Sequence, residues 1–244
     1  MMKVENKIVL TEMIIGMDDH LYHRDTMQIS VAESVEKQAR SLERYNLPLY
    51  VLTNTDQQTT QSNVHMLQIE LPKYQIPLSF YFLRWRMAFD FLQAHSEIKW
   101  VALTDATDVE LLNYPFDQLE ENRIYFGDEP MYISGSDLII QNKNPTVIQG
   151  WLWANGHLIV LNPGVILGSR MIILEYLGAM IQLINEEELK AVDDSSVAGM
   201  GNLDMAVVNY VAYRYFNRRL VHGRRVSTVF HEQQQNRGSW FKHK

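Results

Sequence analysis

The chain has 244 residues, of which 46% are hydrophobic and 11% aromatic, so it can bury a core of one large α/β domain or two small ones, and a disordered protein is excluded. It has no cysteine, which excludes disulfides, thiolate metal sites and a cysteine nucleophile. The sequence shows neither an N-terminal signal segment nor a run of about 20 apolar residues. We therefore expect a protein without a membrane span that is cytoplasmic, in the host cell if a phage encodes it.

The first half of the chain alternates between strand and helix patterns. Val31, Val35, Ala39 and Leu42 recur at helical spacing, and the polar loop at 54–63 separates two short apolar runs. We expect strands at 7–15, 49–53, 64–71 and 100–103, and helices at 26–45 and 79–94. Such a β-α-β order predicts a parallel sheet.

Two acids follow the strand expected at 100–103. Asp105 and Asp108, three positions apart at the end of an apolar run, would repel each other and raise each other's pKa unless a cation or a helix N-terminus neutralised them. Ligands of open α/β sheets bind at the carboxyl ends of strands, and paired carboxylates suit Mg²⁺ or Mn²⁺. The segment therefore predicts a divalent metal site. The alternative is that either aspartate caps the turn after the strand.

The second half of the chain has a more mixed pattern. We expect short strands at 124–126, 138–141 and 158–161, and helices at 169–185 and 203–216. The segment 161–169, LNPGVILGS, predicts a glycine-rich turn that lets the backbone approach a ligand closely. It has neither the G-x-G-x-x-G of a dinucleotide site nor the pattern of a P-loop, which disfavours NAD binding and ATP hydrolysis.

The net charge of −7 conceals a basic segment at 214–244, which has eight lysines or arginines against one acid, Glu232. Such a segment favours an anionic partner, either a diphosphate or a nucleic-acid backbone. The alternative is a solvated surface helix and tail. The cations are Arg214, Arg218, Arg219, Arg224, Arg225, Arg237, Lys242 and Lys244.

Three segments, in this order, resemble motifs of the nucleotide-diphospho-sugar transferases, which are glycosyltransferases of the GT-A fold. The segment LTDATDV at 103–109, with Pro115 and Phe116 after it, resembles the family's D-x-x-D-V metal motif. LNPGVILG at 161–168 is similar to its N-x-G-V-x-x-G segment, and LDMAVVN at 203–209 to its D-Q-x-x-x-N helix start. Two residues depart from the family pattern: Pro163 stands where a small residue is usual, and Met205 where glutamine is usual.

The resemblance implies an α/β fold with a Rossmann-like, mixed and mostly parallel central sheet flanked by helices. It implies one domain over 1–244, with a nucleotide-binding half at 1–116 and a half for donor sugar and acceptor at 117–244. The implied activity is a metal-dependent hexosyl or pentosyl transfer from a nucleotide-sugar, most simply a UDP-sugar, with Mn²⁺ or Mg²⁺ as cofactor.

The resemblance also implies roles for individual residues. Asp105 and Asp108 would bind the ion that bridges the diphosphate, Asp105 would also engage the nucleotide, and a late histidine would be the third ligand. Of His222 and His231 we prefer His231, because 228–231 looks like a short strand that ends in this residue. The remaining implied contacts are Thr11, Asn54 and Asp56 at the nucleotide, Arg84 or Arg86 at the sugar or diphosphate, and Asn162, Gly164 and Asp204 at the donor sugar and acceptor.

Two of these roles leave a choice open. Arg84 and Arg86 are two positions apart on one helix and face different directions, so only one is expected to act. The resemblance favours retaining relatives, which need no clear protein base, whereas Asp204 would be a candidate base in an inverting enzyme.

The acceptor is open at the level of sequence. A hydroxylated base of phage DNA would fit the basic segment, with the base flipped into the pocket. A glycan, a lipid-linked sugar or a small metabolite is the alternative, with the arginines holding the donor diphosphate. Two other classes remain: a non-catalytic nucleotide-sugar-binding domain, and a nucleotidyltransferase, for which the loop GMDD at 16–19 is acidic where a basic, glycine-rich loop is expected.

Overall fold

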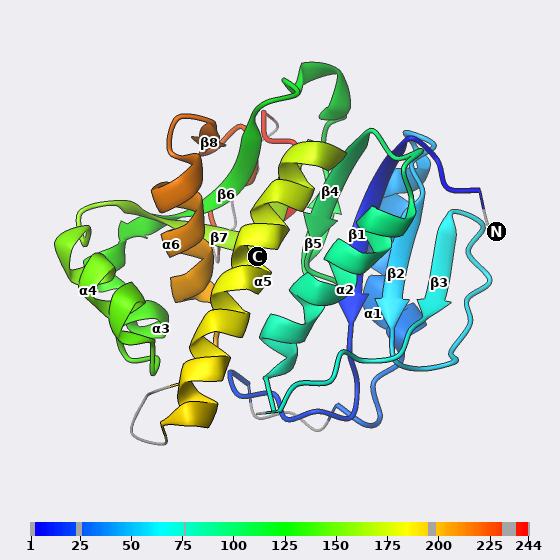
Figure 1. The fold of residues 1–244 in the computed structure, drawn as a ribbon. Helices are drawn as coiled ribbons and strands as arrows, with labels where there is room; N and C mark the ends of the chain where they lie inside the picture. The colour runs from blue at the N-terminus through cyan, green and yellow to red at the C-terminus, as the bar shows by residue number, and fades with distance from the viewer. Residues whose placement is uncertain (1–2, 23–25, 76, 195–198, 231–237, 244) are drawn as a thin grey trace.

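A seven-stranded mixed sheet with the strand order β3-β2-β1-β4-β7-β6-β8 organises the fold (Figure 1). The computed structural model describes residues 3–22, 26–75, 77–194, 199–230 and 238–243. Strands β1 to β4 are mutually parallel, β7 is antiparallel to both β4 and β6, and β8 is parallel to β6. The expected α/β class with a mostly parallel sheet is confirmed. The strands are β1 (Lys7–Met13), β2 (Leu49–Thr53), β3 (Val64–Gln68), β4 (Trp100–Thr104), β6 (Ile124–Tyr132), β7 (Ile159–Ser169) and β8 (Leu220–His222).

Alternation of apolar side chains along the strands produces two hydrophobic layers. Ile8 and Leu10 of β1 belong to one layer and Val9 to the other, since successive side chains of a strand point to opposite faces. Helices α2 (Phe80–Ala94), α5 (Arg170–Asp193) and α6 (Met205–Phe216) cover the first face and lie in front of the sheet in Figure 1. Helix α1 (Val31–Glu43) covers the other face.

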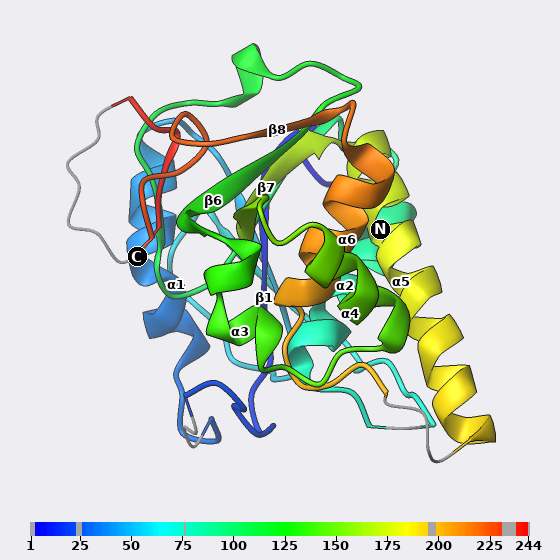
Figure 2. The same cartoon turned by 90° about the vertical axis from the view of Figure 1, so that its left-hand side faces the viewer.

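Smaller elements complete the fold. A two-stranded antiparallel sheet of β5 (Val109–Leu111) and β9 (Phe241–His243) packs on the α1 side. The connection between β6 and β7 contains α3 (Asp137–Ile140) and α4 (Thr146–Ala154), which face the viewer in Figure 2. Short 3₁₀ turns lie at η1 (Phe116–Gln118) and η2 (Ile133–Gly135).

Most predicted elements are present, and side-chain caps fix the start of two of the helices. Helix α1 begins five residues later than expected, at Val31, because the Ser30 side chain accepts a hydrogen bond from the Glu33 amide. The four apolar residues that predicted this helix, Val31, Val35, Ala39 and Leu42, are all fully buried. In the same way Ser169 caps α5 by accepting from the Ile172 amide.

Three local predictions were wrong. Residues 137–140 form helix α3 where a strand was expected at 138–141, and residues 228–230 form no strand. The segment 161–169 is not a turn but lies within the central strand β7. A bulge explains the misleading pattern: Phe126 pairs with Ile166 but Gly127 pairs with Asn162, so the residues around Pro163 interrupt the ladder. Proline in a sheet interior is tolerated at such bulges.

The sheet joins the two halves expected at 1–116 and 117–244, because β4 of the first half is hydrogen-bonded to β7 of the second. Among the residues that the structure describes, no helix is long and apolar enough to cross a membrane.

Candidate metal site

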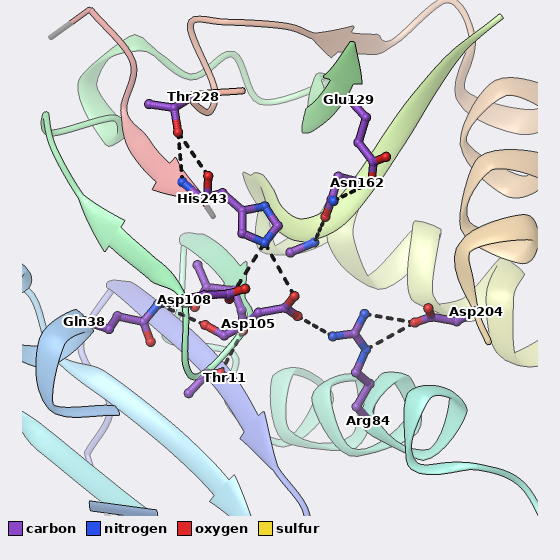
Figure 3. A network of polar contacts seen from close by, with 12 residues as sticks. Thr11, Gln38, Arg84, Asp105, Asp108, Glu129, Asn162, Asp204, Thr228 and His243 are labelled. Carbon is purple, nitrogen blue, oxygen red and sulfur yellow. Dashed lines mark hydrogen bonds and ion pairs between the residues drawn. The ribbon is translucent and has the colours of Figure 1, made fainter. Parts of the chain in front are cut away.

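Asp105, Asp108 and His243 meet at the carboxyl end of β4, where their ligand atoms all lie within 4.8 Å of one another (Figure 3). His243 Nε2 is 3.7 Å from Asp105 Oδ2 and 3.8 Å from Asp108 Oδ1. These separations exceed a hydrogen bond but are shorter than about 4.2 Å, twice the bond length from Mg²⁺ to oxygen. Carboxylates are ligands that suit Mn²⁺ and Mg²⁺, and a neutral imidazole nitrogen is a common metal ligand, so the donor set fits a divalent ion.

The pairing of β5 with β9 places His243 beside the two aspartates. β5 starts directly after Asp108 and pairs with β9, which places Val109 opposite His243. The Thr228 hydroxyl accepts a hydrogen bond from the His243 amide at 3.0 Å and donates one to its carbonyl at 3.2 Å. The ring of His243 lies 4.7 Å from that of Phe230, and the residue is only 2% exposed. The imidazole is therefore held in place from both its backbone and its ring.

Gly164 leaves the space between these side chains open. A Cβ at this position would lie 2.1 Å from His243 Cε1, 2.4 Å from His243 Nε2 and 2.8 Å from Asp105 Oδ2, so any side chain would fill the site. The position of the glycine is fixed by Asn162, whose Oδ1 accepts from the Gly164 amide at 2.8 Å and whose Nδ2 donates to Glu129 Oε1 at 2.8 Å. The Gly164 carbonyl in turn accepts from the Asp105 amide at 3.0 Å.

Arg84 bridges two carboxylates beside the metal site (Figure 3). Its guanidinium reaches Asp105 Oδ1 at 2.6 Å and Asp204 Oδ2 at 2.9 Å, and the Trp85 indole N–H also donates to Asp204 Oδ2, at 2.9 Å. Burial would lower the pKa of Arg84, but the charges of Asp204, Asp105 and Glu12 outweigh it and raise that pKa. Burial raises the pKa of Asp204, against the opposing effect of Arg84.

Buried polar side chains hydrogen-bond to Thr104, the last residue of β4. The Thr11 hydroxyl donates to the Thr104 carbonyl at 2.7 Å, and Gln38 Nε2 donates to the Thr104 hydroxyl at 2.8 Å. Thr11 is fully buried, so its side chain offers no surface to a nucleotide. The next residue, Glu12, is partly buried, and burial, reinforced by the charge of Asp105 and opposed by Arg84, raises its pKa to about 8.

The structure brings six of the residues that the sequence indicated together at the metal group, and it gives Asn54 and Arg86 partners outside that group. Asn54 is partly buried and exchanges hydrogen bonds with the Ile15 backbone at 2.8 and 2.9 Å, and Asp56 is exposed. Arg86 pairs with Asp90 at 2.9 Å. The six gathered residues are Arg84, Asp105, Asp108, Asn162, Gly164 and Asp204.

The histidine of the site is one that the sequence reasoning missed. His231 lies outside the described residues, and His222 instead pairs with Asp128 at 2.9 Å, where burial lowers its pKa. His243 ends the run WFKH at 240–243, in which apolar and polar residues precede a histidine. An apolar stretch ending in histidine had favoured His231, and Lys242 interrupts such a stretch directly before His243, so the sequence carries only part of that signal for His243.

Acidic or amide side chains engage several cations of the basic segment. Arg219 pairs with Glu175, Arg224 with Asp128, and Lys242 with Glu110. The guanidinium of Arg225 donates to the Gln118 side chain and lies over the Trp240 ring. Part of the positive charge that the sequence shows at 214–244 therefore serves contacts within the fold.

No protein-family model and no curated protein matches this chain.

Proposed function

We propose that this chain is a metal-dependent glycosyltransferase of the GT-A fold that transfers a sugar from a nucleotide-diphosphate donor, most simply a UDP-sugar. The observation that carries the proposal is the Asp105, Asp108 and His243 group opposite the open space at Gly164. The three sequence motifs that resemble those of the nucleotide-diphospho-sugar transferases supply residues to this one place: two acids from the first, Asn162 and Gly164 from the second, and Asp204 from the third.

The chemistry of sugar transfer matches such a site. Breaking the bond between a sugar and a nucleotide diphosphate leaves negative charge on the departing phosphate, and a bound Mn²⁺ or Mg²⁺ would neutralise that charge. Asp105, Asp108 and His243 would hold the ion. Arg84 holds Asp105 by its Oδ1 atom, while Oδ2 faces His243, so the carboxylate is fixed with one oxygen toward the metal group. The bridge of Asn162 keeps the backbone at Gly164 in position beside it.

The contacts of Asp204 favour a positioning role over that of a base. Its Oδ2 atom receives hydrogen bonds from Arg84 Nε, from a second guanidinium nitrogen and from the Trp85 indole, and the side chain is 3% exposed. A buried carboxylate whose Oδ2 atom accepts three hydrogen bonds from the protein is held by those donors and is not directed at an acceptor hydroxyl. This arrangement agrees with a retaining enzyme, in which no protein base deprotonates the acceptor.

For the acceptor we favour a glycan or a small molecule over DNA. The pairing of Arg219, Arg224 and Lys242 with acids reduces the positive charge that a phosphate backbone would meet. Arg214, Arg218 and Arg219 line a surface hollow of about 440 Å³ together with Tyr215 and Asn217. Retention on a duplex-DNA column at low salt, released by added salt, would support DNA as acceptor instead.

The test is release of the nucleoside diphosphate from a panel of nucleotide-sugars in the presence of Mn²⁺ or Mg²⁺. We expect donor hydrolysis by the wild-type chain that EDTA abolishes. Asp108→Ala should lose it, with the fold retained. Asp117→Ala should keep it, because Asp117 is an exposed aspartate that pairs with Lys7 at the start of β1, at the opposite end of the sheet from the metal group.

The same assay separates the other classes. A wild-type chain that binds Mn²⁺ and a nucleotide-sugar but releases no diphosphate from any donor would be a non-catalytic binding domain. Formation of a nucleotide-sugar from a nucleoside triphosphate and a sugar phosphate would identify a nucleotidyltransferase. Either result contradicts the proposal.

A further inference from the structure

A cavity that shares no lining residue with the metal group lies against α2, the C-terminal half of α5 and the loop that precedes α2. Its volume is about 570 Å³, within the range of pockets that take small molecules. Helices α2 and α5 lie side by side here (Figure 1). The wall of this cavity includes Tyr74, Arg86, Asp90, Glu188, Leu189 and Val192.

One part of the wall is apolar and open to solvent. Leu189 is 61% exposed and Val192 46% exposed, although both are large aliphatic residues, and they lie one turn apart on α5. Tyr74 and Pro72 add further apolar surface from the loop. An alkyl chain of a few carbons would cover this surface.

Four of the five charged residues in the wall form two ion pairs. Lys73 lies 2.9 Å from Glu70, and Arg86 lies 2.9 Å from Asp90. Both pairs join neighbours in the chain and cancel their own charge. This leaves the carboxylate of Glu188 as the charge of the wall for which the described residues provide no ion pair.

Glu188 is 6% exposed, and its Oε2 atom is buried without a hydrogen-bond donor from any residue that the structure describes. The carboxylate otherwise interacts with the Met200 backbone. Burial raises the pKa of Glu188, as expected for a buried acid whose charge is not compensated. A buried carboxylate oxygen of this kind is costly unless a donor reaches it.

We propose that this cavity binds a small organic cation, with its charged head on Glu188 and its alkyl chain against Leu189 and Val192. A cationic nitrogen would supply the missing donor and form a charge-assisted hydrogen bond. An anion is disfavoured by the uncompensated carboxylate. A hard metal ion is disfavoured too, because it needs several oxygen ligands and the other two carboxylates in the wall already pair with cations.

The experiment uses the full chain with labelled leucine and valine methyl groups, in EDTA, followed by NMR. The probes are n-butylammonium and n-butylguanidinium, with n-butylurea as an uncharged probe of similar shape. We expect saturable shifts of the Leu189 and Val192 methyl signals with at least one cation, and an affinity for the urea that is at least about tenfold lower. Whichever cation binds more tightly identifies the head group. Equal binding of the urea and the cations would overturn the proposal.

Glu188→Gln removes the charge but keeps the shape, and should weaken binding of the preferred cation by at least about tenfold. Glu186→Gln is the matched control, since Glu186 is exposed on the same helix and hydrogen-bonded to Gln182. It should bind as the wild type does. Unchanged affinity in Glu188→Gln would overturn the proposal.

Val192→Lys tests the site without touching the buried acid. This side chain is already 46% exposed, so the fold should tolerate the change, and the new ammonium group at the rim should repel the cation and weaken its binding. Wild-type affinity in this variant would count against the proposal even if Glu188→Gln failed to fold. The readout needs no glycosyl transfer, so it is independent of the proposed enzymatic function.

Discussion

Gly164→Ala is the substitution that tests the metal site most sharply. The new methyl group would lie 2.1 Å from His243 Cε1, whereas ordinary van der Waals contact begins at 3.4 Å. The imidazole would have to retreat by about 1.3 Å, the difference between these two distances. It cannot do so freely, because its backbone pairs with β5 and its ring packs against Phe230.

A displacement of this size is decisive for metal binding. Metal–ligand distances tolerate deviations of about 0.2 Å, several times less than the required shift. Removing even an outer partner of a metal ligand typically lowers the affinity about 10- to 100-fold. Loss of the imidazole and crowding of Asp105 together should exceed this, so we expect Gly164→Ala to bind Mn²⁺ at least about 100-fold more weakly than the wild type.

The assay is titration with Mn²⁺, following the free ion by electron paramagnetic resonance, with chemical denaturation of the same samples to verify the fold. Gly150→Ala is the matched control, because a Cβ at Gly150 meets no atom within 4 Å, and it should bind Mn²⁺ as the wild type does. Wild-type affinity in a folded Gly164→Ala protein would refute the assignment of this space to a metal ion.

Three further predictions concern the surroundings of the site. Arg84→Ala breaks a buried charge network and should lower the free energy of unfolding, measured with urea, by about 3–5 kcal/mol. Arg86→Ala breaks an exposed ion pair on the same helix and should lower it by less than about 1 kcal/mol. Folding raises the pKa of Glu12 from 4.5 to about 8, so between these pH values the folded state keeps a proton that the unfolded state has lost. The free energy of unfolding of the metal-free protein should therefore fall as pH rises from 4.5 to 8. Chemical denaturation across that pH range should show a smaller decline for Glu12→Gln. Asn209→Ala removes three buried hydrogen bonds, two to the Leu161 backbone and one to the Met205 carbonyl. It should lower the free energy of unfolding, measured by heat or urea, by about 2–4 kcal/mol. A loss below about 1 kcal/mol would contradict a stabilising role for these hydrogen bonds.

Where a single periodicity dominates, the sequence was sufficient to predict the element. The strand at 49–53 has the expected bounds, and the apolar spacing of Val31 to Leu42 identified the buried face of α1. The segment 161–169 failed because its pattern mixes two signals. Asn162, Pro163 and Gly164 are turn-forming residues, yet they lie in a central strand whose bulge is stabilised by neighbours in β6. Such tertiary compensation is not visible in a local window.

The residues of the candidate site fall into two groups: those that local sequence indicated, and those that only tertiary contacts bring to the site. Asp105 and Asp108 stand close together in the chain at the end of a strand, so local sequence indicated them. His243 is brought to them by the pairing of β5 with β9, two three-residue strands far apart in the chain. Strands of three residues show little periodicity, and several histidines near the C-terminus are candidates for the third metal ligand, so the sequence alone does not identify it. Arg84 and Arg86 are the same residue type on the same helix, so the sequence does not distinguish them. The packing of α2 buries Arg84, which bridges two carboxylates, and leaves Arg86 in an exposed pair with Asp90.

The charges around the site suggest an order of events for the proposed reaction. Asp105, Asp108 and Asp204, when ionised, carry three negative charges against the one positive charge of Arg84, which leaves a net charge of −2. Glu12, with a pKa of about 8, is mostly protonated at pH 7 and adds little to this sum. A nucleotide diphosphate approaching the metal-free group would be repelled, because like charges at short range in a partly buried site are weakly screened. A divalent ion cancels the −2, so we expect the ion to bind before the donor.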